Sequence, residues 1–403
     1  MKPSHLLCTW RAALTVVVIV RACLGGDLRA QTYLVTDLGT LGGEASRALS
    51  INNAGLVVGR ATTPGGQTHA VLLSTNVLVD LGTLGGTNSA ATDISEASHV
   101  TGWSNFAETG AQRAFLYTAG TMIDIGRLLS DSTNSIGHGV NSLGTVVGDY
   151  QTADGRLHPF VYANGILPLG FEGSARCIND LGQIGGFEIN NGKLGFIISG
   201  AQRQHVGSLG SNDTEIVRLN TNGLAVGRSL TTNGVYHACA YQDGVLHDLG
   251  TLGGSSSAAY GVNNPGHIVG QALDASGNER AFVYQRGRMT DLNTLLPGTS
   301  GWILQAAYGI NDSGQIVGVG QINGKVHGFL LTPNFLDLSL YPGLTMVGRV
   351  GRKYRVEYLD AINPTNTWQA LTNMVLPGSP YFFIDPRPLG FGNRLYRSVL
   401  LPD

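Results

Sequence analysis

The sequence predicts an all-β protein, a seven-bladed β-propeller built from repeats of about 43 residues and followed by a small β-sandwich-like domain. Composition is the first observation behind this prediction. Charged residues make up only 13% of the 403 positions and glycine occurs 58 times, which disfavours a helical protein and suits many tight turns between short strands. The 42% of hydrophobic residues can support a core and argues against disorder.

An internal repeat is the second observation. Its centre reads apolar residue, Asn, two variable residues, Gly, three residues, Gly. The seven copies begin at Ile51, Ile94, Val140, Ile178, Leu219, Val262 and Ile310 and close at Gly59, Gly102, Gly148, Gly186, Gly227, Gly270 and Gly318. The closing glycine always lies eight residues after the start, whereas successive copies are 38 to 48 residues apart. The centre of the unit is therefore one fixed structure, with variable loops between copies.

Each repeat centre predicts a hairpin. Asn at the first turn position and Gly at the fourth favour a type I turn, as in Asn52–Gly55 and Asn311–Gly314. The second copy departs, with Ser95 and Ser98 at these positions. The residue three before each start is mostly small: Ala48, Ala91, Gly137, Ala175, Ile216, Ala259 and Ala307. Small side chains indicate a crowded inner strand near a central axis.

Two more strands complete each unit. The third is predicted at 70–73, 114–117, 159–162, 195–198, 238–241, 281–284 and 328–331, and the fourth ends in Asp-Leu-Gly-like segments at 80–82, 124–126, 248–250 and 291–292. Four short strands are the content of a propeller blade. The fourth-strand motif also occurs ahead of the first unit, at Tyr33–Gly39. We therefore expect this segment to complete the seventh blade and remove an exposed sheet edge.

The two ends of the chain differ from the repeats. Residues 1–30 have basic residues before the apolar run 12–20 and predict a secretory signal peptide cleaved near Ala30, with a lipoprotein site at Cys23 disfavoured by Arg21. Its removal leaves two cysteines, Cys177 and Cys239, too few for a disulfide framework or a thiolate zinc site. Residues 338–403 predict about five strands, including 354–358, 368–371, 381–384 and 394–397, in a β-sandwich-like spacer or attachment domain.

These motifs resemble a known family. The segment Asp80–Gly86, the Ile-Asn-x-x-Gly-x-x-x-Gly centre and tripeptides such as His69–Val71 and Arg113–Phe115 resemble the bacterial extracellular HAF repeat family, named for His-Ala-Phe. The resemblance covers residues 31–334. It implies export from a bacterial cell and a secreted or surface role, and it brings no established reaction or catalytic residue. The end of the chain is similar to small β-sandwich modules of secreted bacterial proteins.

No catalytic, cofactor-binding or metal-binding residues are predicted. The repeated aspartates Asp37, Asp80, Asp124, Asp248 and Asp291 are interpreted as turn caps, and the histidines His69, His158, His237 and His327 as repeat-encoded strand residues. The Asp-Leu-Gly-Thr-Leu-Gly-Gly loops lack the Lys and following helix of a phosphate site. No Gly-x-Ser-x-Gly segment is present.

Four aromatic residues break the repeat pattern and are the candidate ligand-binding loop residues: Trp103, Phe106, Tyr150 and Trp302. They are expected on loops at one face of the disc, where aromatic side chains stack on sugars or anchor a protein. The alternative interpretation is packing over the blade edges.

Charge and hydropathy narrow the function. The net charge of −2 gives no basic nucleic-acid footprint, and after the signal peptide no apolar run approaches the ~20 residues of a membrane span. We predict an exported, extracellular or surface (or periplasmic) binding scaffold without a cofactor, for a polysaccharide, a cell-wall component or another surface protein. Two alternatives stay open: an extracellular enzyme acting on glycans, and a purely structural surface component.

Overall fold

The computed structural model describes residues 32–74, 77–129, 131–334, 343–346, 349–359, 367–384 and 395–402. These residues are all-β, as predicted, and their helical segments are the short 3₁₀ turns η1 (Gly126–Leu128) and η2 (Leu292–Leu295). The signal peptide predicted at residues 1–30 lies outside the described residues. The chain divides into a large unit, Ala30–Asn334, and a unit containing Phe335–Asp403.

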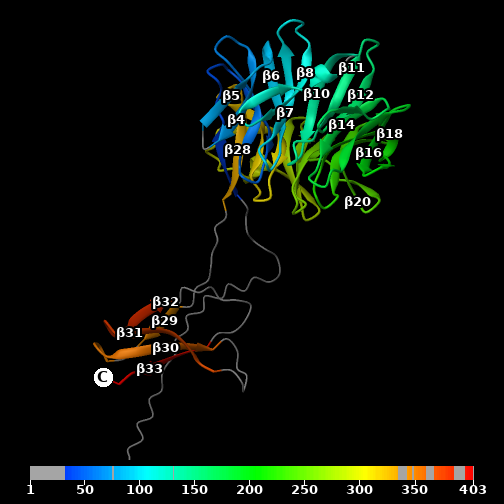
Figure 1. Cartoon of the computed structure of the whole chain (residues 1–403). Coiled ribbons are helices and arrows are strands. Elements are labelled where there is room, and N and C mark those ends of the chain that lie inside the picture. Colours follow the sequence, from blue (N-terminus) through cyan, green and yellow to red (C-terminus); the bar gives the residue numbers. More distant parts are fainter. Residues whose placement is uncertain are drawn as a thin grey trace, which may run out of the picture. The chain divides into compact units, whose positions relative to one another are not determined.

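The large unit consists of antiparallel four-stranded groups that follow the sequence repeats (Figure 1). Repeat 1 forms β2 (Ser46–Ile51), β3 (Val57–Thr62), β4 (Thr68–Ser74) and β5 (Val77–Gly82). Repeat 2 forms β6 (Gly85–Ile94), β7 (Val100–Phe106), β8 (Gln112–Thr118) and β9 (Thr121–Asp124). Repeat 3 forms β10 (Ser132–Val140), β11 (Val146–Thr152), β12 (Leu157–Tyr162) and β13 (Ile166–Pro168). In each group the strands are hydrogen-bonded in chain order.

Repeats 4 and 5 together form an eight-stranded sheet. It contains β14 (Gly173–Ile178), β15 (Ile184–Ile189), β16 (Lys193–Ser199) and β17 (Gln202–His205), then β18 (Gly210–Leu219), β19 (Ala225–Thr231), β20 (Tyr236–Gln242) and β21 (Val245–Asp248). The two halves are joined by one parallel bridge, between Lys193 and Asp213. Repeat 6 forms β22 (Gly253–Val262), β23 (Ile268–Asp274), β24 (Glu279–Gln285) and β25 (Arg288–Asp291).

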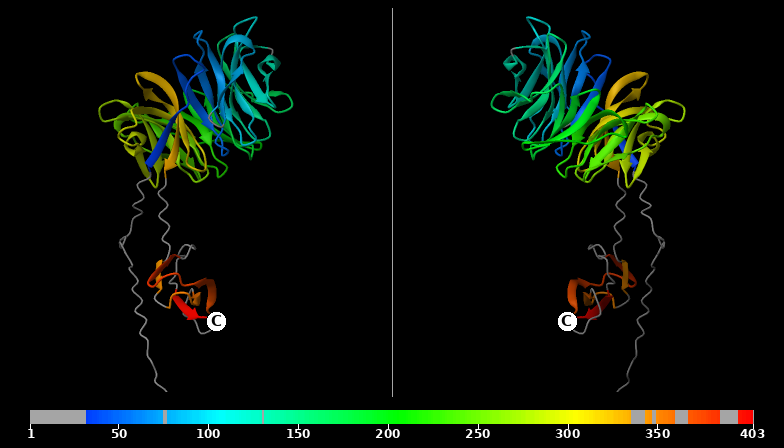
Figure 2. Two further views of the ribbon diagram at one scale, coloured as in Figure 1. Left: turned by 90° about the vertical axis from the view of Figure 1, so that its left-hand side faces the viewer. Right: turned by 90° about the vertical axis from the view of Figure 1, so that its right-hand side faces the viewer.

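The last repeat takes its fourth strand from the start of the chain, as predicted. It forms β26 (Trp302–Ile310), β27 (Ile316–Ile322) and β28 (Lys325–Asn334), and β1 (Thr32–Asp37) pairs antiparallel with β28. The blue strands of the first repeat lie beside the orange β28 in Figures 1 and 2, in agreement with contacts of β2 with β26, β27 and β28. Residues about 290 positions apart in sequence are thereby joined, as in the ion pair between His327 and Asp37.

The conserved spacing of the repeat centre has a steric cause. Each inner strand carries a β-bulge just before its end, and the carbonyl of the residue two positions before the bulge lies over the closing glycine of the next strand. A Cβ on Gly270 would lie 2.1 Å from the Ala258 carbonyl oxygen and 2.8 Å from the Phe282 ring. The equivalent clash at the other six closing glycines is 1.8 to 2.0 Å. Only glycine fits there, because any side chain would displace the inner strand.

The hydrophobic core is divided between repeats. The Phe of the third strand is fully buried in five of them: Phe115, Phe160, Phe196, Phe282 and Phe329. The small residues predicted on the inner strand are also buried, which confirms that this strand is crowded. Cys239 replaces the phenylalanine in repeat 5 and, like Cys177, is a buried free thiol, in agreement with its interpretation as a small core residue. Burial raises the pKa of both thiols to about 12.

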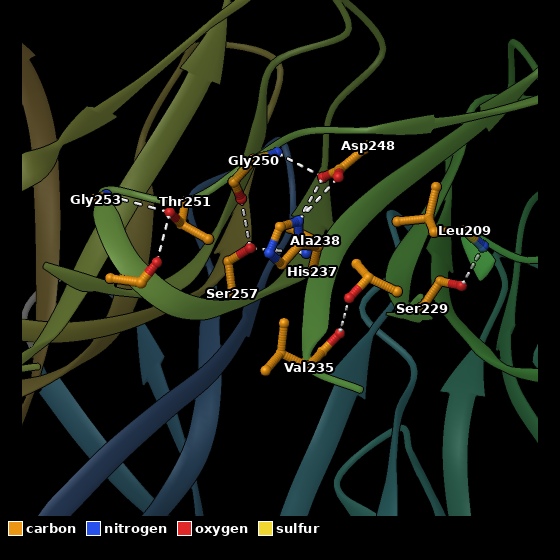
Figure 3. A network of polar contacts seen from close by, with 12 residues as sticks. Leu209, Ser229, Val235, His237, Ala238, Asp248, Gly250, Thr251, Gly253 and Ser257 are labelled. Atoms are coloured by element: carbon orange, nitrogen blue, oxygen red, sulfur yellow. Dashed lines mark hydrogen bonds and ion pairs between the residues drawn. The ribbon is translucent and has the colours of Figure 1, made fainter. Parts of the chain in front are cut away.

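Polar clamps join neighbouring sheets through the His-Ala and Asp-Leu-Gly segments. Figure 3 shows one clamp: His237 Nδ1 is 2.9 Å from the Asp248 carboxylate, which also accepts the Gly250 N–H at 2.8 Å. The Ala238 N–H donates to Ser257 Oγ of the next repeat at 2.8 Å. His69 and Asp80 repeat this contact at 2.8 Å. The interpretation of these aspartates as turn caps is confirmed, and the histidines are used in structure.

The second unit is a small pair of sheets. One sheet joins β29 (Gly343–Met346) to β32 (Tyr381–Ile384), and the other has β30 (Lys353–Leu359) between β31 (Gln369–Val375) and β33 (Leu395–Leu400). Met346, Val356 and Leu376 are buried between them, with Tyr381 and Phe383 packed alongside. Glu357 accepts from Arg355 and Arg397 at 2.7 and 2.6 Å. Alternation of apolar and polar residues predicted four of these strands.

Candidate functional site

The inner strands present two different polar regions, one at each end. We call the end with the Asn-x-x-Gly turns the asparagine end. There, the side-chain amide of each turn asparagine donates to a backbone carbonyl of the following repeat, at 2.9 to 3.4 Å. Asn311 of the last repeat donates at 3.1 Å to the carbonyl of Asn52 in the first. The link from Ser95 to Asn141 is missing, because the serine side chain is too short.

A second series of contacts lies one residue further along each turn. The Asn264 N–H donates to Asp312 at 2.8 Å, and the Asp312 N–H donates to Asn53 Oδ1 at 2.8 Å. The Asn53 N–H in turn donates to Glu96 at 2.9 Å. Asp180 accepts from Ser142 at 2.8 Å. The exposed carboxylates of this rim are therefore bound to neighbouring turns.

A cavity of about 170 Å³ opens inside this rim and is lined by all seven repeats. At its wall Arg218 of repeat 5 is paired at 2.7 Å with Asp93 of repeat 2. Asp93 also accepts from Ser50 Oγ at 2.7 Å and from the Val140 N–H at 3.1 Å. Burial alone would lower the pKa of Arg218, but the charge and hydrogen bond of Asp93 outweigh it and raise that pKa. The polar groups of the cavity wall thus bind each other across the inner strands.

The opposite region, which we call the arginine end, is built from three inner positions of each repeat: four and two residues before the apolar start, and one residue after the closing glycine. Here the residue type changes from repeat to repeat. The polar and aromatic members are Arg47, Arg60, Thr92, Trp103, His138, Asp149, Ser174, Arg176, Phe187, Glu215, Arg228, Tyr260, Gln271 and Tyr308. Side chains that differ at repeat-equivalent positions are not needed by the repeat itself.

Repeats 1, 6 and 7 contribute a basic and aromatic group to the arginine end. Arg47 and Arg60 are directly opposite each other on β2 and β3. Arg47 Nη1 donates to Tyr308 Oη at 3.4 Å, and the rings of Tyr308 and Tyr260 are 5.3 Å apart at 41°. All four side chains are half-buried. The group therefore offers guanidinium donors beside partly accessible aromatic rings.

Repeats 3 to 5 contribute a more strongly paired group. His138 Nε2 is 2.7 Å from Asp149 and 3.1 Å from Arg176 Nη1. Burial, with the Arg176 charge, lowers the pKa of His138 although Asp149 opposes this. Ser174 donates to Asp149, not to the histidine, so the three residues do not form a nucleophile and base pair. Glu215 accepts from Lys193 and, at 3.0 Å, from Arg228.

The four aromatic residues predicted as loop residues lie in strands, so that part of the prediction is wrong. Tyr150 on β11 packs against the core of repeat 3, with its ring 5.4 Å from that of His158. Trp302 on β26 packs edge-on against Phe329 at 6.2 Å. The Arg113 guanidinium is 3.8 Å from the Phe106 ring centroid. Trp103 occupies the position equivalent to Arg60 and belongs to the arginine end. Extended pairing of the hairpins placed these residues on strands.

Comparison with known proteins gives no family: no family model and no curated protein matches the chain. Similar solved structures include TolB from Acinetobacter baumannii, with 13% identity, a TM-score of 0.34 and coverage of 73% of this chain and 65% of TolB. A Trypanosoma rangeli sialidase gives 8% identity, a TM-score of 0.38 and coverage of 92% and 87%. The Aleuria aurantia lectin gives 10%, 0.34, 72% and 94%. All three TM-scores are low, so function has to be inferred from this chain's own residues.

Among the described residues, no helix is long and apolar enough to cross a membrane.

Proposed function

We propose that residues 32–334 form a seven-bladed β-propeller, closed by β1, that is exported and binds saccharides at the arginine end without chemical change. The support for closure is the set of contacts that returns to the first repeat. Asn311 donates to Asn52, and the Gly328 N–H donates to Ser46 Oγ at 3.0 Å. Export rests on the segment 1–30 and on the likeness of the repeats to the HAF type.

The observation that carries the binding function is the tyrosine pair within a set of variable polar residues. Tyr260 and Tyr308 are half-buried at inner positions where other repeats have Leu49, Thr92 or Val217. Tyr260 Oη donates to Gln271 at 3.5 Å, so an amide lies beside the rings. Aromatic faces with neighbouring amide and guanidinium donors suit the apolar and hydroxyl faces of a sugar ring.

Binding is preferred to catalysis because the titratable groups nearby are already committed to each other. Asp149 is held by His138 and Ser174, and Glu215 by Lys193 and Arg228. Burial disfavours ionisation of Glu215, but Lys193 and Arg228 outweigh it and lower its pKa, so this carboxylate is a poor general acid at neutral pH. A binding scaffold needs no free acid or base.

The test is a binding screen of the full chain against neutral and acidic oligosaccharides by calorimetry, with product analysis of each ligand afterwards. We expect binding of at least one saccharide, recovered intact. Substitution of Tyr260 or Tyr308 by Ala should weaken it roughly fivefold, since an aromatic contact contributes about 1 kcal/mol. Leu143→Ala, at an 84% exposed side chain in an Asn-x-x-Gly turn, is the control and should have no effect. Cleaved saccharide would favour the glycan-acting enzyme instead, and absence of binding would contradict the proposal.

A further inference from the structure

Arg47 and Arg60 form a like-charge pair. They are cross-strand neighbours on β2 and β3, and within the described residues no carboxylate lies within ion-pair distance of either guanidinium. Like charges directly opposite each other destabilise a sheet. Burial, and then the Arg47 charge, lower the pKa of Arg60, with a smaller opposing effect of Tyr308. The pair is therefore kept at an energetic cost to the empty protein.

Three other arginines of the large unit show that this cost is avoidable. Arg218 is paired with Asp93 at 2.7 Å, Arg228 with Glu215 at 3.0 Å and Arg113 with Asp124 at 2.8 Å. The partners of Arg228 and Arg113 lie on neighbouring strands, and Asp93 reaches Arg218 from repeat 2. The sequence thus supplies carboxylates to these three arginines and supplies none to Arg47 and Arg60. A carboxylate from outside the chain would fill the same role.

The neighbouring tyrosines indicate what carries that carboxylate. Tyr308 Oη accepts from Arg47 at 3.4 Å, and Tyr260 continues the aromatic surface 5.3 Å away. A guanidinium fork binds a carboxylate in a bidentate manner, whereas the adjoining rings suit the carbon face of a pyranose. A small inorganic anion would use the arginines and leave the tyrosines without a function.

We propose that Arg47, Arg60, Tyr308 and Tyr260 form a subsite for an acidic sugar, with the carboxylate between the two guanidinium groups and the sugar ring on the tyrosines. This inference rests on the proposed saccharide binding and adds the ligand class. It makes the arginines the specificity determinants and the tyrosines the general sugar contacts.

The experiment compares each acidic oligosaccharide with its own methyl ester, which keeps the sugar and removes the charge. Calorimetry of the full chain would use hexamers of galacturonic acid, mannuronic acid and hyaluronan, each with its esterified form. We expect at least one free acid to bind tenfold or more tightly than its ester, and this preference should decrease as salt is raised. Equal binding of acid and ester in every pair would overturn the inference and leave the proposed function standing. Failure of all saccharides to bind would overturn both.

The variants assign the preference to the arginine pair. Arg60→Met should weaken binding of the preferred acid about 10- to 100-fold, the range given by a charged hydrogen bond, with little change for the ester. Arg288→Met, at an exposed arginine of β25, is the matched control and should retain full affinity. An Arg60→Met protein that binds the acid normally would overturn the assignment.

Two further measurements secure the result. If Arg60→Met fails to fold, as judged by circular dichroism, Arg60→Lys keeps the charge and should still lose about tenfold in affinity because the planar fork is lost. Unchanged affinity in Arg60→Lys would overturn bidentate recognition. Inorganic sulfate is the competitor that distinguishes a sugar from a bare anion. Sulfate displacing the hexamer at a concentration similar to that of the sugar acid itself would overturn the sugar assignment.

Discussion

The two ends of the inner strands are made from the same seven repeats, but their polar side chains differ in whether they find partners within the chain. At the asparagine end, the turn asparagines bind the next repeat, and even the pair of Arg218 and Asp93, from repeats 5 and 2, is complete within the chain. At the arginine end, Arg47 and Arg60 face each other without a carboxylate. Groups that recur in every repeat stabilise the fold, whereas groups that occur in one repeat and lack a partner indicate a ligand.

This difference implies that substitutions at the two ends have opposite effects on stability. Residues of the asparagine end make several hydrogen bonds each, so their removal leaves backbone groups without partners. At the arginine end, Arg47 and Arg60 make few hydrogen bonds and repel each other.

The largest change is expected for Asn220→Ala. Asn220 is buried, accepts from the N–H groups of Asn222 and Leu224 at 2.9 and 3.0 Å, and donates to Asn263 at 2.9 Å. Loss of these contacts should cost about 3 kcal/mol, measured by urea denaturation. Asn222→Ala, in the same turn, removes one exposed hydrogen bond to the Asn264 carbonyl and is the control, which should cost at most about 1 kcal/mol. Equal costs for the two variants would refute a structural role of the buried asparagines.

The second-largest change is a gain in stability, expected in repeat 2, where the series of asparagine contacts is interrupted. Ser95→Asn would extend the side chain of repeat 2 toward repeat 3, where the donor to Asn141 is missing. One added hydrogen bond should stabilise the protein by about 1 kcal/mol. Ser98→Gly, in the same turn, provides a separate comparison of stability, because it relieves backbone strain and adds no hydrogen bond. Ser98 has a φ of 64°, which glycine adopts without strain. No gain from Ser95→Asn would mean that the gap between repeats 2 and 3 is too wide for an asparagine.

The sequence was sufficient for most of the fold. The Asn-x-x-Gly hairpins, the four strands of each repeat and the pairing of β1 with the last repeat are local or periodic features, and these were predicted. The reason for the closing glycine was not predictable, because it depends on how closely a backbone carbonyl of the preceding strand approaches the glycine. The four aromatic residues were assigned to loops because the length of the outer hairpin ends cannot be read from turn residues alone.

The candidate site was largely missed for a different reason. Attention to repeated motifs selected aspartates and histidines that bind each other, such as His237 and Asp248. The positions that mark the candidate site are those where the residue type changes within an otherwise uniform repeat. The position two before the apolar start reads Leu49, Thr92, His138, Arg176, Val217, Tyr260 and Tyr308. Which of these meet across the inner strands depends on register and bulges, so Arg47, Arg60 and Tyr308 could be grouped only in the structure.

At the arginine end, Arg60→Met should stabilise the empty protein. Methionine keeps an unbranched apolar stem and removes one of the two like charges, for a gain of up to about 0.5 kcal/mol in low salt. High salt should reduce the gain, because screening weakens the repulsion in the parent protein. Urea denaturation at two ionic strengths provides the measurement. A loss of stability in Arg60→Met would show that the guanidinium contributes more by packing than it costs by repulsion.

The smallest effect is expected from Glu96, at the rim of the asparagine end. Burial is the main cause that raises the pKa of Glu96 above its usual 4.5, and the charges of Asp312, Asp180 and Asp93 add to it, against the hydrogen bond from Asn53. The folded protein therefore holds this proton more tightly than the unfolded chain, so stability falls as pH rises through the region just above 4.5. Glu96→Gln still accepts from Asn53 but cannot ionise, and it should remove that part of the pH dependence. Because Glu96 is largely exposed, solvent screening limits the gain at neutral pH to a few tenths of a kcal/mol. Parallel urea titrations from acid to neutral pH would detect it, and identical pH profiles for the two proteins would contradict a raised pKa of Glu96 in the folded protein.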